Sequence, residues 1–353
     1  MKTLKYLIPL ALAAVLPVTA SAQETLNLFN WTDYMNPKII KQFEKKYHVK
    51  VVQTYYSSNA ELLAKLMAGG DSQYDVVVPS SYLIQRLVET HLIRKLNKAE
   101  LPNFKNLAPQ FQNTSYDPHD TYAIPYQWGT TGLAYDTRKF KNPPQTWGIL
   151  FDKKVNPSYP FAMMGGSGQD IIGAACAYQG HGMGCDKLAD WKSAAKLLIE
   201  TKQRHNFVGF VDGTPALHQL EKGIIAAGLV YHGDLAQAME NSPKATKYIK
   251  YIIPKGGAEI WVDNMAIPSH APHPKLAHEF INFILDAKIG AELSNWNVYA
   301  SPNAAAKPYL DKVLNSRLVQ PTAAEWKRLQ FVPVLKGEKL TQFKAIWSAV
   351  REH

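Results

Sequence analysis

Cysteine is scarce in this sequence, because Cys176 and Cys185 are the only two among 353 residues. Two cysteines are too few for a disulfide-dense scaffold or for a zinc site built from thiolates. Internal repeats and low-complexity tracts are also missing, and the 22 prolines and 21 glycines are spread along the chain. This composition excludes collagen, coiled coils and disordered tails, and it suits about two globular domains.

Long apolar runs are missing beyond the first 22 residues. Within that segment, Lys2 and Lys5 precede an apolar run from Leu7 to Val18, and small residues follow up to Ala22. The run has about 12 residues, whereas a membrane-spanning helix needs about 20. The pattern predicts an export signal over residues 1–22, cleaved after Ala22, and a mature protein in the periplasm.

The two cysteines would lie in the oxidising periplasm, where disulfides form. Cys176 and Cys185 lie nine positions apart, so a disulfide between them would close a short loop. We expect this bond to form, since disulfides persist in exported proteins. Two free thiols remain the alternative, because the sequence does not show whether the side chains approach each other.

Positive charge is in excess, with 39 Lys and Arg against 29 Asp and Glu, but it is not clustered. The densest run, five lysines within residues 38–50, is typical of the solvated face of one helix. Binding to nucleic acid would require a basic stripe with interleaved aromatic residues, which we do not find. We therefore expect no nucleic-acid partner.

Apolar strands and amphipathic helices alternate along the chain. Strands are predicted at residues 25–30, 50–55 and 74–79, with helices between and after them. A second set follows residue 131, with helices at 188–202 and 274–286 and strands at 226–231, 248–254 and 259–268. This order predicts an α/β fold with a mostly parallel sheet, in which ligands bind beyond the carboxyl ends of the strands.

Aromatic and acidic residues recur together at these strand ends. A carboxylate accepts charged hydrogen bonds and an aromatic face attracts a cation, so the combination is typical of a site for an organic cation. A single such pair is more often a core aromatic beside a surface acid, but repetition in both halves of the chain favours a site. The groups are Trp31 with Asp33 and Tyr34, Tyr231 with Asp234, and Trp261 with Asp263.

Five segments together resemble the spermidine- and putrescine-binding proteins of bacterial polyamine ABC transporters. They are FNWTDY at residues 29–34, YDVVVPS at 74–80, IPYQWG at 124–129, WVDNMAIP at 261–268 and YASPN at 299–303. The resemblance implies a type II-like periplasmic binding protein fold with two parallel or mixed sheets flanked by helices and a ligand cleft between two lobes. Lobe one would comprise residues 24–130 and 262–304, and lobe two residues 131–261 and 305–353.

The resemblance also implies a set of ligand contacts. Trp31 and Trp261 would hold the methylene chain between them, and four aspartates would receive the ammonium groups. This four-acid set favours a diamine, as does the turn Tyr231–Asp234, which is similar to that of putrescine-preferring members. By position the contacts are Trp31, Asp33, Tyr34, Ser80, Tyr82, Asp170, Tyr231, Asp234, Trp261, Asp263 and Tyr299.

The implied function is capture of a polyamine, either a putrescine-like diamine or spermidine, for uptake through an ABC permease in the inner membrane. We expect a monomer without catalytic residues, cofactor or metal. The same fold with another small solute, such as ferric ion, phosphonate or thiamine, is the alternative. A secreted hydrolase is disfavoured, because Gly165–Gln169 lacks the nucleophile-elbow spacing and His278-Glu279 lacks the second histidine of a zinc-protease helix.

Overall fold

A computed structural model describes residues 23–166 and 168–352 of the chain. The predicted export signal, residues 1–22, lies outside the described residues. Within them, no helix is both long and apolar enough to cross a membrane.

The strands form one mixed sheet in the described part of the chain, with the order β2-β1-β3-β9-β4-β7-β5-β6 and with β8 and β10 paired to β4 and β9. The family resemblance implies two sheets, and hydrogen bonding joins them into one. The strands are β1 (Thr25–Trp31), β2 (Lys50–Tyr56), β3 (Val76–Val77), β4 (Ala123–Asp136), β5 (Phe161–Met163), β6 (Phe207–Phe210), β7 (Ala227–Tyr231), β8 (Ile249–Ile252), β9 (Ala258–Ala266) and β10 (Leu329–Gln330).

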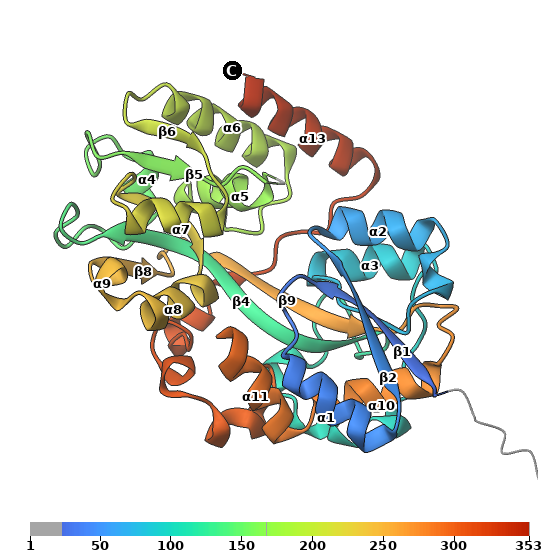
Figure 1. Ribbon diagram of the computed structural model, residues 1–353. Coiled ribbons are helices and arrows are strands. Elements are labelled where there is room, and N and C mark those ends of the chain that lie inside the picture. The colour runs from blue at the N-terminus through green and yellow to red at the C-terminus, as the bar shows by residue number, and fades with distance from the viewer. Residues whose placement is uncertain (1–22, 167, 353) are drawn as a thin grey trace, which may run out of the picture.

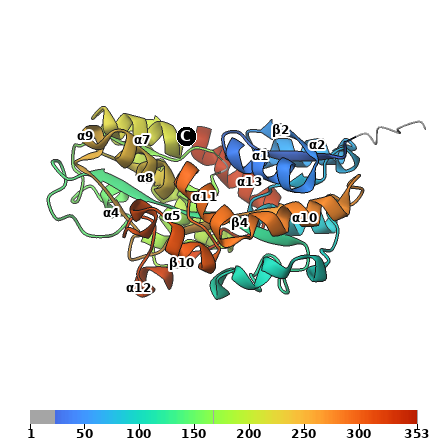
Figure 2. The same ribbon diagram turned by 60° about the horizontal axis from the view of Figure 1, so that its bottom comes forward.

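The α-helices cover both faces of this sheet, and Figures 1 and 2 show how they are arranged. Short 3-10 turns connect several of them. The helices are α1 (Pro37–Tyr47), α2 (Asn59–Met67), α3 (Ser81–Glu89), α4 (Gly148–Phe151), α5 (Gln169–Tyr178), α6 (Leu188–Lys202), α7 (Gly213–Glu221), α8 (His232–Asn241), α9 (Pro243–Thr246), α10 (Pro274–Ile284), α11 (Ala287–Asn297), α12 (Ala323–Trp326) and α13 (Gly337–Glu352).

Strands β4 and β9 join the two halves of the molecule and run side by side through its centre (Figure 1). All 14 residues of β4 are buried. Its first part pairs with β9 as far as Thr131, and from Thr131 onward it pairs with β7. The chain therefore passes from one half to the other inside a continuous strand. The lobe boundaries given above stay a prediction.

Each half has hydrophobic clusters on the two faces of its part of the sheet. In the half that contains β1–β3, one cluster unites these strands with α1, α10 and α11, and the other unites them with α2 and α3. In the other half, α5, α6 and α13 pack on one face, and α7 packs on the opposite face. Helix α13 returns from the far end of the chain to this second half (Figure 1).

Local sequence signals explain where the first helices begin. The Asn36 side chain accepts a hydrogen bond from the Lys38 amide, and Pro37 occupies the first turn of α1. The Ser58 side chain accepts from the Glu61 amide at the start of α2. Side-chain caps of this kind satisfy amides that have no partner within the helix. The predicted helix starts are confirmed at both sites.

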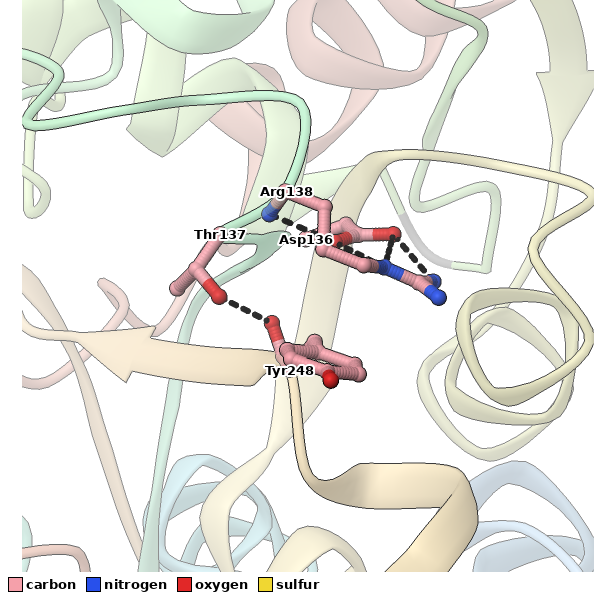
Figure 3. A network of polar contacts seen from close by, with 4 residues as sticks. All are labelled: Asp136, Thr137, Arg138 and Tyr248. Carbon is pink, nitrogen blue, oxygen red and sulfur yellow. Dashed lines mark hydrogen bonds and ion pairs between the residues drawn. The ribbon is translucent and has the colours of Figure 1, made fainter.

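Two features of the second half lie outside the region where β4 pairs with β9. At the end of β4, Asp136 accepts hydrogen bonds from the Arg138 side chain, with the closest N–O pair 2.6 Å apart, and Thr137 donates to the Tyr248 carbonyl (Figure 3). The contact between Thr137 and Tyr248 ties the residue after β4 to the residue before β8. Cys176 and Cys185 form a disulfide with Cα atoms 6.3 Å apart, which confirms the predicted bond.

Candidate functional site

A cleft of ≈ 590 Å³ lies where the two halves meet on β9. Ten of the eleven predicted contact residues line it, and Asp234 is the exception. None of the described residues that line the cleft is a lysine or an arginine, whereas five are acids. The acids are Asp33, Asp170, Asp212, Glu259 and Asp263.

Asp263 is the most deeply placed of the predicted acids, with 7% of its surface exposed. The Ser80 hydroxyl donates to one carboxylate oxygen at 2.6 Å, and the Tyr34 hydroxyl donates to the other at 3.0 Å. The Asn59 amide in turn donates to the Ser80 hydroxyl at 3.0 Å, which directs the serine proton toward Asp263. The carboxylate is therefore held in one orientation by residues from three segments.

The electrostatics of Asp263 favour a cation. Burial raises the pKa of its carboxyl to about 6, although the hydrogen bonds from Ser80 and Tyr34 act in the opposite direction. In the described part of the chain, none of the ion pairs involves this carboxylate. A buried carboxylate of this kind is stabilised when a positive group binds beside it.

Aromatic rings form the walls of the cleft. The Trp261 ring lies edge-on to Tyr231 and Tyr299, with centroids 6.2 Å and 5.5 Å apart. On the opposite half, the Trp31 indole donates to the Val78 carbonyl at 2.9 Å, which fixes its ring. Rings held in this way offer apolar faces that attract methylene groups and cations.

Gly129 makes room for the Trp261 ring. This glycine pairs with Trp261 across β4 and β9. A Cβ atom at position 129 would lie 2.1 Å from the Trp261 ring. Gly129 therefore contributes to the site because it has no side chain. The Trp261 indole can lie directly over the backbone of β4.

The rim of the cleft carries further polar residues. Asp33 is exposed and has a left-handed backbone conformation, with φ 53°. The Tyr82 hydroxyl accepts a hydrogen bond from the Asn59 amide at 2.7 Å, and burial raises the pKa of this tyrosine to about 12. Asp212 accepts from the Gly165 and Gly166 amides at 3.0 Å and 2.8 Å, and so holds the loop before α5.

Asp234 does not line the cleft. Its carboxylate accepts hydrogen bonds from the Tyr299 and Thr214 hydroxyls. Asp234 therefore orients Tyr299 from behind, and its direct contact with a ligand stays a prediction. The sequence pattern places Asp234 near the cleft, but it does not show which way the side chain points.

Sequence reasoning missed Glu259 and Asn59. Glu259 precedes Trp261 and Asp263 at alternate positions of β9, and this period of two was a signal that could have identified it. Asn59 directly follows the N-cap residue Ser58, and its buried amide connects Ser80 with Tyr82. No sequence signal marks that role.

The arrangement offers carboxylates, hydroxyls and aromatic faces. Among the described residues, no group of three or more His, Cys, Asp or Glu side chains is placed to hold a metal ion. Such a cleft can bind a small positively charged solute by desolvating it against the aromatic walls and pairing its charge with carboxylates.

Comparison with known proteins places this geometry in a family. The family model for bacterial extracellular solute-binding proteins matches residues 38–317, which is more than half of the chain. The chain belongs to this family of bacterial extracellular solute-binding proteins. Proteins of the family bind solutes for transport, and this solute-binding protein shares their architecture of two halves around a cleft.

Two relatives and one solved structure illustrate the similarity. This solute-binding protein is 32% identical to the putrescine-binding periplasmic protein SpuD of Pseudomonas aeruginosa, over 98% of both chains. It is 31% identical to the putrescine-binding periplasmic protein PotF of Escherichia coli, over 87% of this chain and 86% of the relative. The structure of a spermidine/putrescine ABC transporter protein from Listeria monocytogenes matches with a TM-score of 0.80 and 28% identity, over 94% and 99% of the two chains.

Proposed function

We propose that this protein is a periplasmic solute-binding protein that captures a polyamine, either a putrescine-like diamine or spermidine, for an ABC transporter. The buried Asp263 carboxylate carries this proposal, because the described residues give it two hydroxyl donors and no cationic partner. The names of the relatives support it, since several contain putrescine or spermidine.

The lining of the cleft offers two kinds of interaction that a polyamine needs. Carboxylates pair with its ammonium groups, and Trp31 and Trp261 pack against its methylene chain. Each buried methylene contributes about 0.8 kcal/mol, and each charge-assisted hydrogen bond contributes about 1.5–3 kcal/mol. The surrounding net positive charge does not prevent binding, because salt screens charges beyond about 8 Å while the local acids lie in direct contact.

After binding the polyamine, the protein would deliver it to the transporter and would not alter it chemically. The two halves would close over the cation, and the closed shape would dock on a permease in the inner membrane. The protein would act as a monomer, without a nucleic-acid partner and without turnover of its ligand. Incubation with putrescine and spermidine should leave both amines chemically intact while they bind saturably.

A thermal-shift panel tests the proposed ligand class. The mature protein is mixed with putrescine, cadaverine, spermidine, spermine, agmatine or ferric ion at increasing concentration. We expect one or more amines to raise the melting temperature in a saturable way, because ligands that bind only the folded state stabilise it. A saturable shift with ferric ion but with none of the amines would overturn the proposal.

Export can be tested on the same protein. Residues 1–22 carry the predicted signal, and we propose cleavage after Ala22. Expression of the full chain in a Gram-negative host should give a periplasmic protein whose intact mass corresponds to a chain that begins at Gln23. Retention in the cytoplasm, or a mass that includes the first 22 residues, would contradict this assignment.

A further inference from the structure

Glu259 is an acid of the cleft that the proposed function has not yet used. Glu259, Trp261 and Asp263 occupy every second position of β9. Their side chains therefore leave the strand on the same face. All three line the cleft. One strand therefore presents a carboxyl, an indole and a second carboxyl in sequence along the floor of the site.

The surroundings of Glu259 are unusual for an acid. Only 6% of its surface is exposed, and the Thr131 hydroxyl donates to its carboxyl at 2.8 Å. The Asp170 carboxyl, on α5 of the same half, lies within hydrogen-bonding reach of it. Burial and the neighbouring Asp170 both raise the pKa of Glu259 well above its ordinary value. A buried carboxyl beside a second acid is stabilised in its ionised form when a cation binds between them.

We propose that Glu259 and Asp170 together bind the second cationic group of the ligand, and that the spacing from Glu259 to Asp263 selects the ligand by its length. This inference rests on the proposed function, since it assigns the first cationic group to Asp263. It adds Glu259 to the binding residues and gives it a part in specificity.

The spacing favours a short diamine. Residues 259 and 263 are four positions apart on a strand that rises about 3.3 Å per residue, so the two side chains leave the backbone about 13 Å apart. Two ammonium–carboxylate contacts of about 2.8 Å each leave about 7–8 Å between the two nitrogens. At about 1.25 Å per bond, the nitrogens lie about 6 Å apart in an extended four-carbon diamine, about 7.5 Å apart in a five-carbon one and about 11 Å apart at the ends of spermidine.

The charge around Glu259 is negative or neutral in the described residues. Its titratable neighbours are Asp170 on α5, Tyr231 on β7, Tyr251 on β8 and Tyr82 on α3. Arg328, just before β10, donates instead to the Ile253 carbonyl at 3.0 Å. The ligand itself therefore provides the positive charge. An ammonium that binds beside Glu259 favours the ionised carboxylate, so a proton held by Glu259 leaves to solvent.

Calorimetry with a series of linear diamines of three to six carbons, together with spermidine, tests the inference. The proteins compared are the parent, Glu259→Gln and the control Glu240→Gln, which changes an exposed acid on α8. We expect the parent and the control to bind the five-carbon diamine best, because its nitrogen spacing matches the roughly 7–8 Å available. Glu259→Gln should bind it about 10–100-fold more weakly, as the loss of a charge contact of about 1.4–2.8 kcal/mol implies, and should lose the length optimum.

Titrations in buffers of different ionisation enthalpy give a second readout, the number of protons released on binding. The parent should release protons at neutral pH, and Glu259→Gln should release fewer. If Glu259→Gln does not fold by circular dichroism, Asp170→Asn replaces it with the same expectations. Unchanged affinity, length optimum and proton release in the folded variant would overturn the inference. A parent that binds no amine of the series would instead overturn the proposed function.

Discussion

Replacement of Asp263 by asparagine should make the ligand-free protein more stable and should strongly weaken amine binding. The substitution keeps the shape of the side chain and removes its charge. The Ser80 hydroxyl can still donate to the amide oxygen, and the Tyr34 hydroxyl can rotate to accept from the amide nitrogen. Only the ionised state, and with it the attraction for an ammonium group, is lost.

The magnitude follows from the raised pKa of Asp263. Burial moves this pKa from its ordinary value of 3.8 to about 6, and a pKa difference of this size corresponds to about 3 kcal/mol. Because the folded state holds the proton more tightly than the unfolded state, stability falls as pH rises from about 4 to about 6, and above that the full penalty persists. At pH 7–8 we therefore expect Asp263→Asn to raise the free energy of unfolding by about 1–3 kcal/mol.

Binding should change in the opposite direction. A ligand ammonium requires the ionised carboxylate, so affinity in the parent should fall about tenfold for each pH unit below about 6. In Asp263→Asn, affinity should be at least about 30-fold lower at neutral pH, and its dependence on pH in this window should weaken. The surface variant Asp311→Asn, which changes an exposed acid, serves as the control.

The assay is chemical unfolding at several pH values, combined with calorimetric titration of the amine that gives the largest thermal shift. The informative quantity is the difference in unfolding free energy between variant and parent. Buried His232 also changes the stability of both proteins over this pH range, in the opposite direction to Asp263. Burial lowers the pKa of His232 to about 4, so protonation of the unfolded chain destabilises the fold as pH falls below about 6.5. The reasoning is refuted if Asp263→Asn is less stable than the parent at pH 8 and still binds the amine with unchanged affinity.

Two further predictions concern Gly129 next to the Trp261 ring and the disulfide outside the cleft. Gly129→Ala should displace the Trp261 ring, because a Cβ atom at position 129 would lie 2.1 Å from it. We expect the fold to be retained and amine binding to weaken by about tenfold or more. Unchanged affinity would show that the position of the ring is unimportant for binding. Replacing both Cys176 and Cys185 by serine should lower the free energy of unfolding by about 2–3 kcal/mol, because the bond closes a short loop. Denaturant unfolding measures this loss, and calorimetry should give an unchanged affinity, since neither cysteine lines the cleft.

Local patterns in the sequence account for most of the elements and for the type of site. Helix α6 covers the predicted residues 188–202, and the capping residues Asn36 and Ser58 begin their helices as expected. These features depend on neighbours a few positions away, so periodicity and capping signals suffice to predict them. The pairing of aromatic and acidic residues at strand ends likewise indicates an organic cation before any fold is known.

The tertiary structure decided how these side chains turn and which of them meet. The contact between Tyr34 and Asp263 joins residues 229 positions apart, and the contact between Glu259 and Asp170 joins a strand to a helix of another layer. The same long-range packing turned Asp234 behind Tyr299 and joined the two expected sheets through β4 and β9. The sequence thus determined the chemistry available to the cleft, because that chemistry lies in residue types and local spacing. Only the packing of distant segments determined which carboxyls are buried and at what separation, because burial depends on neighbours that no local pattern specifies.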